Sequence, residues 1–330
     1  PDDVASIDVV CRPDKRVGPG LKQVREVPIK STAFELDLPL HQIDTFTGWS
    51  PPHDIDLIVT VSFGLLVPAR LLKAATYGGV NVHPSLLPDL RGPAPIHHAL
   101  LQGRKYTGVS LQTMHPTTFD AGVVLAQTPP PSMPIAADAT VAGLVDLLGH
   151  AGADMLTAAI VDQTYASPYQ AIASTDTAET ALQHAPKITP EDRRIDWSTR
   201  SSETILHRDR VLGRLWDTTT VPGLHAATDY SALSSPGTKA RRITFTGPWS
   251  RCASPVKQTE PLQPGQPILL TDSASEATGG ANIGISCADG QVLAPQSATI
   301  EGRRAHQGLP MLRKLLLASK HNAQVANEGI

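Results

Sequence analysis

Two apolar segments joined by a short helical pattern constrain this fold more than any other feature. Residues 56–63 (DLIVTVSF) are β-branched and almost continuously apolar, which is typical of a buried parallel strand. A helical pattern follows over residues 69–75, and the run GVNVH occupies residues 79–83. Strand, helix and strand at this spacing predict a doubly wound α/β sheet. Its ligand crevice would lie beyond the carboxyl ends of the strands, where His83 falls.

The second of these strands carries two polar residues close together. Asn81 and His83 are two positions apart, so their side chains share one face of a strand. The strand ends at Pro84, and the loop SLLP at residues 85–88 has a proline at each end, which leaves it little conformational freedom.

A third polar group is expected at the same place. The sequence FDAG at residues 119–122 predicts a turn that brings the Asp120 carboxylate near the end of a strand pair, within reach of His83. Around it we predict a helix and two strands, over residues 94–102, 107–114 and 123–126.

An amide, an imidazole and a carboxylate around one cleft can carry out acyl-group transfer. The imidazole can take a proton from an attacking amine, and the carboxylate can hold the imidazole and favour its charged form. The amide can donate to the oxyanion of a tetrahedral intermediate, an interaction worth roughly 3 kcal/mol in a dry site. Apart from Ser85, this stretch has no Ser or Cys beside a base, which favours direct transfer over a covalent acyl-enzyme.

The ordered motif N-x-H-P-S-L-L-P, then RG, TGV and D-x-G, resembles the signature of folate-dependent formyltransferases. The resemblance implies that Asn81, His83 and Asp120 are catalytic. It also implies N10-formyltetrahydrofolate as the formyl donor and co-substrate, with no metal. The loop expected to contact the folate consists of Ser85, Leu86, Leu87 and Pro88. Gly64 and Leu65 would either line the pterin end of the crevice or simply pack at a strand end.

The chain is long enough for two domains. We predict a formyltransferase domain over residues 1–183, in which an amphipathic helix over residues 140–165 packs on the sheet. A connector at 184–199 and a smaller domain at 200–330 follow, with a loop insertion at about 228–266. In the smaller domain we predict helices over residues 201–215 and 309–318, strands over residues 267–272, 283–288 and 291–293, and a hairpin turn at residues 288–290.

The connector sequence KITPEDRRIDW resembles the segment that leads into the C-terminal domain of methionyl-tRNA formyltransferases. The resemblance implies a β-barrel (OB-like) second domain that binds tRNA. The basic loop at residues 12–30 resembles the tRNA-contacting insertion of the same enzymes, although Pro19 stands where they have arginine. Phosphate contacts are expected from Lys15, Arg16, Lys22, Arg303 and Arg304. An ordinary solvated surface is the alternative interpretation of these charges.

Composition excludes several other classes of protein. No uninterrupted apolar run reaches the roughly 18 residues that span a bilayer, so no membrane partner is expected. Cys11, Cys252 and Cys287 are far apart and have no zinc or dithiol spacing. His97, His98 and His115 are expected to be surface or core histidines.

The resemblance to methionyl-tRNA formyltransferases implies transfer of a formyl group to the α-amine of methionyl-tRNA, and we expect a monomeric enzyme. The alternatives are a folate-dependent formyltransferase for a small amine such as glycinamide ribonucleotide, a formyltetrahydrofolate hydrolase or dehydrogenase, and an inactive tRNA- or folate-binding relative. The Pro-rich second half suggests a eukaryotic enzyme of the mitochondrial matrix, with the bacterial cytoplasm as second choice. We expect that the strand and helix that open the family's fold are missing from this chain.

Overall fold

The structure is a computed structural model, and it divides the chain into two compact units, residues 1–187 and 188–330. Parts of three predicted features, at 228–266, 267–272 and 309–318, lie outside the described residues. The structure describes residues 4–172, 182–218, 241–252, 262–270, 283–314 and 316–317.

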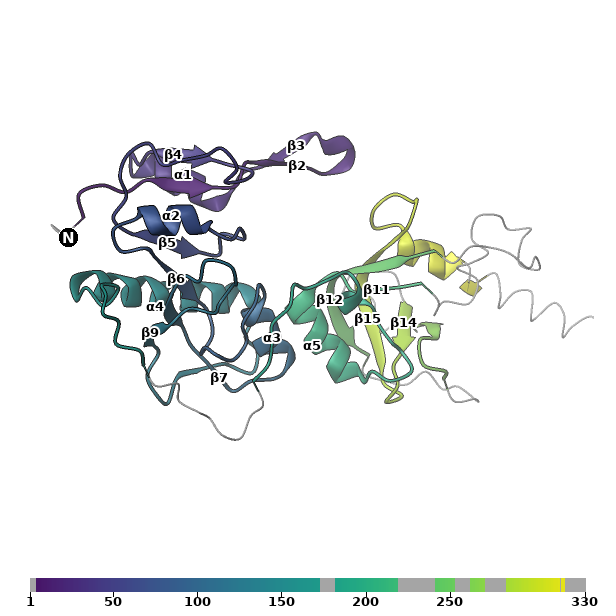
Figure 1. The fold of residues 1–330 in the computed structure, drawn as a ribbon. Helices are drawn as coiled ribbons and strands as arrows, with labels where there is room; N and C mark the ends of the chain where they lie inside the picture. The colour runs from purple at the N-terminus through teal and green to yellow at the C-terminus, as the bar shows by residue number, and fades with distance from the viewer. Residues whose placement is uncertain are drawn as a thin grey trace, which may run out of the picture. The chain divides into compact units, whose positions relative to one another are not determined.

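The first unit is an α/β domain, as the sequence predicts (Figure 1). Its main sheet has four strands in the order β5-β6-β8-β9, and β1 pairs with β4 in a separate sheet. The elements of this unit are β1 (Val9–Cys11), β2 (Lys15–Val17), the 3-10 helix η1 (Pro19–Leu21), β3 (Gln23–Arg25), α1 (Pro28–Glu35), β4 (Leu40–Gln42), β5 (Ile58–Val61), α2 (Ala69–Ala74), β6 (Gly79–His83), α3 (Pro95–Leu101), β7 (Tyr106–Thr107), β8 (Ser110–Thr113), β9 (Val124–Gln127), β10 (Met133–Pro134) and α4 (Val141–Val161).

The main sheet is mixed rather than purely parallel. β5 and β6 are parallel and joined through α2, which confirms the predicted strand-helix-strand unit. β8 then runs antiparallel to β6, and β9 antiparallel to β8. Ten residues separate β8 from β9, and such a short connection cannot make the crossover that a parallel neighbour needs.

Helices cover both faces of this sheet. On one face, a side-chain carbon added at Gly79 would lie 2.9 Å from a Leu72 methyl group of α2. On the other, a carbon added at Gly152 of α4 would lie 2.7 Å from a methyl group of Val82. Side chains alternate along β6, so Asn81 and His83 belong to the α2 face and Val82 to the α4 face. The sheet therefore presents its polar residues on the side opposite α4.

The helix α4 confirms the predicted helix over 140–165, and it begins where the Thr140 hydroxyl accepts a hydrogen bond from the Gly143 amide at 3.1 Å. Among the described residues it is the one helix long and apolar enough to cross a bilayer, with a mean hydropathy of 1.4 over 18 residues. Asp146, His150 and Asp154 interrupt the apolar run. One face of the helix, with the buried residues Leu144 and Leu148, packs on α3, β6, β8 and β9, and 22% of the apolar window is buried.

Two details of the first unit differ from the sequence-based expectations. The predicted basic loop at 12–30 contains a β-hairpin, in which Lys15 pairs with Arg25, and the start of α1. This β2–β3 hairpin projects from the rest of the unit (Figure 1). The strand predicted to be buried is exposed at Val59 and Val61, by 40% and 60%. These side chains share the face of their register partners Val80 and Val82, and the helix on that face, α4, packs on β6, β8 and β9.

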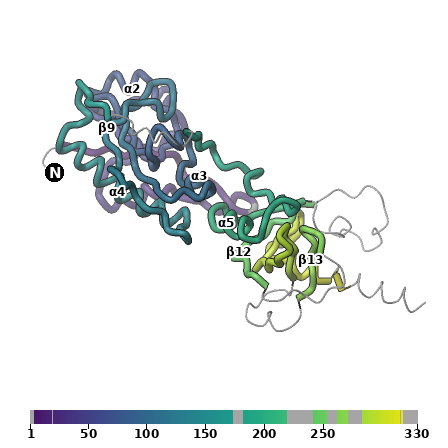
Figure 2. Tube along the Cα trace, turned by 90° about the horizontal axis from the view of Figure 1, so that it is seen from below, coloured from purple at the N-terminus to yellow at the C-terminus, as the bar shows by residue number. Residues whose placement is uncertain are grey.

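The second unit contains a five-stranded antiparallel sheet in the order β11-β12-β15-β14-β13. Helix α5 begins at the Ser201 cap and packs against β12 (Figure 2). The hairpin turn predicted at 288–290 is confirmed between β14 and β15, where Gly290 has a φ of 74°. The elements are the 3-10 helix η2 (Glu191–Arg193), α5 (Ser202–Leu212), β11 (Trp216–Asp217), β12 (Ile243–Arg251), β13 (Pro267–Leu269), β14 (Ile283–Ser286) and β15 (Val292–Ile300), and residues 308–314 are also helical.

Two predictions about this unit need correction. The segment at 228–266 is not all loop, because residues 243–251 form the long strand β12, which pairs with both β11 and β15. No pair closes this sheet into a barrel within the described residues, since β11 and β13 form its two edges there. The antiparallel sheet is therefore established, and barrel closure is not.

The predicted connector contributes to the core of the second unit. Trp197 is 2% exposed, and its indole nitrogen donates to the Asp217 carboxylate at 3.2 Å. Its ring meets those of Phe245 and Trp249 edge-on, each at a centroid distance of 6.2 Å. The Ile195 amide donates to the Trp216 carbonyl at 2.8 Å. The IDW sequence is therefore a packing element of the sheet domain and not a free linker.

Burial raises the pKa of the Asp209 carboxyl in α5 to about 6. Because this value exceeds that of the unfolded chain, about 3.9, the second unit loses stability as the pH rises from about 4 to 6. We expect Asp209→Asn, which stays uncharged, to raise the melting temperature of the second unit above pH 6. The difference from the wild type should become small at pH 4, where the folded carboxyl is neutral and the unfolded one is only about half ionised. Thermal melts at pH 4 and 7 measure the difference in melting temperature between the variant and the wild type. An equal difference at the two pH values would contradict the role assigned to Asp209.

Candidate active site

Strand β6 positions two of the predicted catalytic side chains. Asn81 and His83 lie on one face of it, as the alternation of a strand requires. The His83 side chain is only 6% exposed, and that of Asp120, its partner across the site, is 10% exposed. The site is therefore largely shielded from bulk water, which strengthens its electrostatic interactions.

Asp120 lies in the turn between β8 and β9 with a left-handed φ of 52°. One of its carboxylate oxygens, Oδ1, is 3.4 Å from both Asn81 Nδ2 and His83 Nδ1. The other, Oδ2, accepts a hydrogen bond from the Gly92 amide at 3.0 Å. The structure thus brings together the amide, the imidazole and the carboxylate that the motif singles out.

The second nitrogen of His83 has a backbone partner. Nε2 lies 3.1 Å from the carbonyl oxygen of Leu90. A carbonyl oxygen only accepts, so Nε2 carries a hydrogen in this arrangement. With the Asp120 carboxylate facing Nδ1, the imidazole is flanked by two acceptors, and only its doubly protonated form donates to both.

Two buried residues at this site were not found from the sequence. Thr60 donates its hydroxyl hydrogen to Asn81 Oδ1 at 2.9 Å, and Gln112 donates from Nε2 to Asp120 Oδ1 at 3.0 Å. The strand registers place Thr60 beside Asn81 and Asn81 beside Gln112. The available signal was a polar residue within each of the three strands, Thr60, Asn81 and Gln112, but only the strand register shows that these residues are neighbours.

The loop at residues 85–88 is held by the neighbouring strands. Ser85 is buried and donates its hydroxyl hydrogen to the Asp89 carbonyl at 2.8 Å. The Leu87 amide donates to the Ser110 hydroxyl at 3.0 Å, and Gln127 Nε2 donates to the Leu87 carbonyl at 2.9 Å. Because the Ser85 and Leu87 side chains are buried, Leu86 and Pro88 are the more accessible side chains of this loop.

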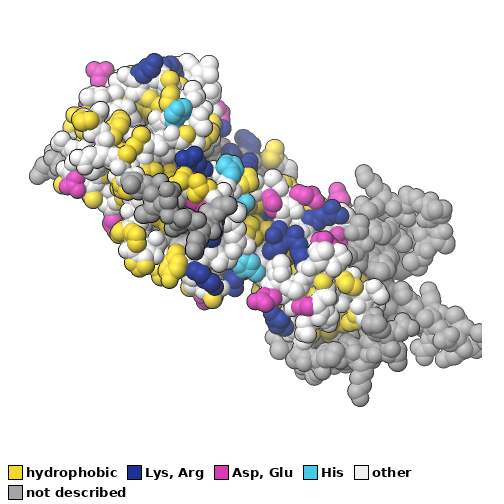
Figure 3. Space-filling view, turned by 60° about the horizontal axis from the view of Figure 1, so that its bottom comes forward, with side chains coloured by type: hydrophobic (Ala, Val, Ile, Leu, Met, Phe, Trp, Pro, Cys, Tyr) yellow, Lys and Arg dark blue, Asp and Glu magenta, His cyan; other side chains and the backbone are white. Residues whose placement is uncertain are grey.

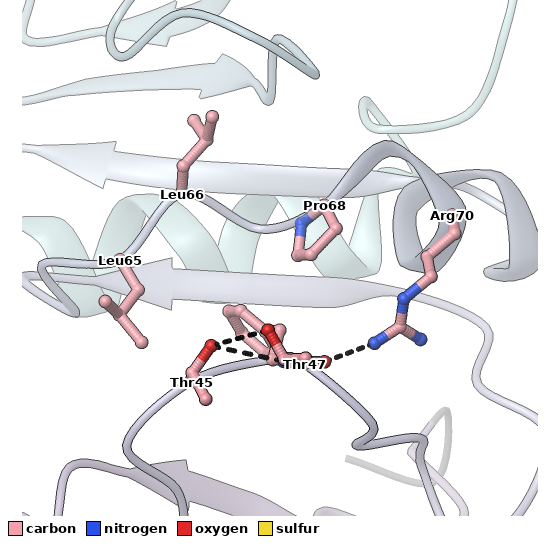
Figure 4. Close-up of a pocket in the computed structure, with 7 residues that line it drawn as sticks. Thr45, Thr47, Leu65, Leu66, Pro68 and Arg70 are labelled. Atoms are coloured by element: carbon pink, nitrogen blue, oxygen red, sulfur yellow. Dashed lines mark hydrogen bonds between the residues drawn. The ribbon is translucent and has the colours of Figure 1, made fainter.

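A cavity of about 260 Å³ lies where the loops that follow β4 and β5 meet (Figure 4). Arg70 of α2 donates from Nη2 to the carbonyl oxygens of Phe46 and Trp49, at 2.5 and 2.6 Å, and so ties the loop after β4 to this helix. Gly64, with a φ of 77°, lies in the second loop. The cavity is lined by Thr45, Phe46, Thr47, Leu65, Leu66, Pro68 and Arg70. Leu65 thus faces a cavity at the carboxyl ends of parallel strands.

The basic residues singled out from the sequence are exposed. Lys15 and Arg16 lie on β2 of the hairpin and Lys22 follows η1, whereas Arg303 and Arg304 follow β15 in the second unit. On the face drawn in Figure 3, Lys and Arg side chains are interspersed with Asp and Glu. The five predicted residues are thus accessible to a polyanion.

Within the ranges that the structure describes, no group of three or more His, Cys, Asp or Glu side chains is arranged to hold a metal ion. His98 Nε2 lies 2.9 Å from the carbonyl oxygen of Pro186, and the His115 ring contacts the Thr117 hydroxyl. These two histidines therefore have local structural partners.

Gly122 is a position where a larger residue should disturb the site. A side-chain carbon added there would lie 1.7 Å from the Thr113 carbonyl oxygen, which belongs to the backbone of β8. We expect Gly122→Ala to lower the free energy of unfolding by about 1–3 kcal/mol and to move Asp120 out of place. Gly149→Ala, on an exposed turn of α4 with open space around it, is the matched control and should be neutral or slightly stabilising. Equal effects of the two changes in thermal melts would contradict this account.

Comparison with known proteins places this site in a family. Residues 2–160 match the formyl transferase family. The chain is 33% identical over 277 residues to the methionyl-tRNA formyltransferase of Enterococcus faecalis, covering 80% of this chain and 85% of that one. It is also 33% identical over 247 residues to the mitochondrial methionyl-tRNA formyltransferase of Saccharomyces cerevisiae, covering 64% of this chain and 61% of that one.

Among solved structures, HypX from Aquifex aeolicus in complex with tetrahydrofolic acid is similar, with a TM-score of 0.47 and 18% identity over 79% of this chain and 40% of that chain. The chain spans less than two thirds of the length of the yeast enzyme, but most of the Enterococcus faecalis enzyme. By its sequence identity to these enzymes over most of its length, the chain belongs to the methionyl-tRNA formyltransferase family.

Proposed function

We propose that this protein transfers a formyl group from N10-formyltetrahydrofolate to the α-amine of methionine esterified to initiator tRNA. The observation that carries the proposal is the convergence of Asn81 and His83 on one oxygen of Asp120, each at 3.4 Å. Membership of the methionyl-tRNA formyltransferase family supports this choice of acceptor.

In the proposed reaction, the amine nitrogen attacks the formyl carbon and forms a tetrahedral intermediate. Asn81 donates a hydrogen bond to the oxygen that becomes negative. His83 takes the proton that the amine loses, and the bond between the formyl carbon and N10 of the folate breaks as His83 gives this proton to N10. The α-amine has an ordinary pKa of about 7.7–8.0, so its deprotonation costs little near neutral pH.

The environment of His83 defines when it can act as this base. Its Nε2 hydrogen is directed at the Leu90 carbonyl, 3.1 Å away. For Nε2 to accept the amine proton, the substrate amine must replace the Leu90 carbonyl there while Asp120 accepts from Nδ1. Tightening of such contacts on substrate binding is a common property of catalytic groups.

We assign the substrate contacts by position. The loop of Ser85, Leu86, Leu87 and Pro88, together with Gly64 and Leu65, would contact the folate. Lys15, Arg16 and Lys22 on the hairpin, with Arg303 and Arg304, would contact tRNA phosphates. Residues 1–183 would form the catalytic domain, 184–199 the connector and 200–330 the tRNA-binding domain, whose five-stranded sheet would be part of an OB-like barrel. A mitochondrial yeast relative is consistent with action in mitochondria.

The test is formyl transfer from labelled N10-formyltetrahydrofolate with methionyl-tRNA and glycinamide ribonucleotide offered in parallel. Label on methionyl-tRNA alone is the expected result. Label on the small amine alone would retain the Asn81, His83 and Asp120 chemistry but overturn the tRNA assignment. Label on neither acceptor, with folded protein, would overturn the proposed activity.

A further inference from the structure

A row of three polar side chains crosses the main sheet at the active site. Thr60 on β5 is the register partner of Asn81 on β6, and Asn81 is the partner of Gln112 on β8. Register partners lie on the same face of a sheet, with side chains in reach of each other. Thr60 is 9% exposed and Gln112 is 1% exposed, so both polar groups are buried beside the proposed catalytic residues.

Thr60 determines which way the Asn81 amide faces. The Thr60 hydroxyl donates to Asn81 Oδ1 at 2.9 Å, which directs Nδ2 toward Asp120 Oδ1 at 3.4 Å. In the flipped amide, Oδ1 would face the carboxylate, and two acceptors would repel each other. Nδ2 carries two hydrogens, so an amide fixed in this way can hold Asp120 with one and present the other to an oxyanion.

Gln112 fixes the Asp120 carboxylate at the other end of the row. Its Nε2 donates to Asp120 Oδ1 at 3.0 Å, and its Oε1 accepts from the Gly122 amide at 3.2 Å. One side chain therefore holds both the carboxylate and the backbone of the turn that carries it. The 3.0 Å contact between Gln112 Nε2 and Asp120 Oδ1 is shorter than the 3.4 Å contacts of Oδ1 with Asn81 and His83.

We propose that Thr60 and Gln112 are positioning residues for the formyl transfer, which set the orientation of the Asn81 amide and of the Asp120 carboxylate before substrate binds. The inference rests on the proposed function. Neither side chain needs to touch substrate, so their loss should lower kcat and leave the KM values nearly unchanged. Displacement of a reacting group by about 1 Å can cost roughly 100-fold in rate.

The first test uses variants of similar shape. Thr60→Val removes the hydroxyl, Thr60→Ser keeps it, and Gln112→Met removes the amide. We expect kcat to fall about 10- to 100-fold in Thr60→Val and Gln112→Met, with at least half of the activity kept in Thr60→Ser. The control is Thr157→Val on the exposed face of α4, where the lost hydroxyl bonds only its own helix. Folded variants with kcat within twofold of the wild type would overturn the proposal, as would equal losses in Thr60→Ser and Thr60→Val.

The second test has a pH readout that a purely structural role would not produce. Gln112→Glu places a carboxylate against Asp120 at neutral pH, where it repels, but its protonated form can donate to Asp120 as the amide does. The ratio of variant to wild-type kcat should therefore rise at least fivefold between pH 8 and pH 6. A ratio that does not change with pH would overturn the role assigned to Gln112.

A third readout does not depend on activity. The two side-chain NH resonances of Asn81 should be well separated and exchange slowly in the wild type, and should broaden or coalesce in Thr60→Val. If the wild type formylates neither acceptor, the proposed function fails, and this spectrum still decides whether Thr60 orders the amide. Identical Asn81 resonances in the two proteins would overturn the inference.

Discussion

His83→Ala is expected to lower kcat for formyl transfer by about 10²–10⁴-fold, the range of a lost general base. The imidazole lies between Asp120 Oδ1 and the Leu90 carbonyl, and its removal takes away the proposed acceptor of the amine proton. Binding of the folate donor should change little, because the proposed folate contacts come from the loop at 85–88. Initial rates at saturating donor, with a separate measurement of folate affinity, check both statements.

The control for this change is His115→Ala. His115 is exposed and contacts the Thr117 hydroxyl, outside the proposed site. Its replacement should leave kcat within about twofold of the wild type, as is usual for surface positions. Unchanged turnover in His83→Ala, with the fold intact, would remove His83 from the mechanism.

Asn81→Ala is expected to lower kcat by about 10²–10³-fold, the usual loss when one oxyanion donor is removed. The change also removes a donor from Asp120 Oδ1, which leaves Gln112 and His83 as its side-chain contacts. The double variant with His83→Ala should be little slower than the slower single variant, because residues that act as one unit are not additive.

Steady-state kinetics separate this role from simple substrate binding. A contact made only in the transition state lowers kcat and kcat/KM equally, whereas a contact made equally in the ground state raises KM alone. A rise in KM with unchanged kcat would therefore contradict the oxyanion role. The Asn81→Asp side chain cannot donate a hydrogen bond in its charged form. Its loss of kcat should therefore be at least as large as that of Asn81→Ala.

The sequence predicts the core of this site because the relevant information is local. Asn81 and His83 are two residues apart on a strand, so their common face follows from the alternation of side chains. The FDAG turn likewise predicts that the Asp120 carboxylate reaches them, and the structure puts these groups 3.4 Å apart. Their roles in catalysis stay predictions until the variants are measured.

Residues that depend on strand pairing could not be predicted in the same way. Thr60 and Gln112 are 21 and 31 positions from Asn81, and only the registers β5–β6 and β6–β8 place them beside it. The exposure of Val59 and Val61 also depends on tertiary structure, because α4, on their face of the sheet, packs on β6, β8 and β9. The apolar composition of these strands gives no information about their register or about the exposure of Val59 and Val61.

The strand β12 was missed for a local reason. Its alternation is broken by a change of register between Thr246 and Trp249, where Gly247 has a φ of 82° and Pro248 follows. Glycine and proline inside a strand usually mark a bulge, but they also make the sequence look like a loop. Here the glycine is required by a close approach, since a side-chain carbon at Gly247 would lie 2.1 Å from Gln296.

The amide of Gly92 that donates to Asp120 belongs to a loop that also holds the end of the first unit. The Ala185 amide donates to the Arg91 carbonyl at 2.7 Å, and the Ala94 amide donates to the Ala185 carbonyl at 3.2 Å. The chain enters the second unit only three residues later, at Ile188. A pull on the chain at that boundary would therefore act on two backbone hydrogen bonds of the loop that holds the Asp120 carboxylate.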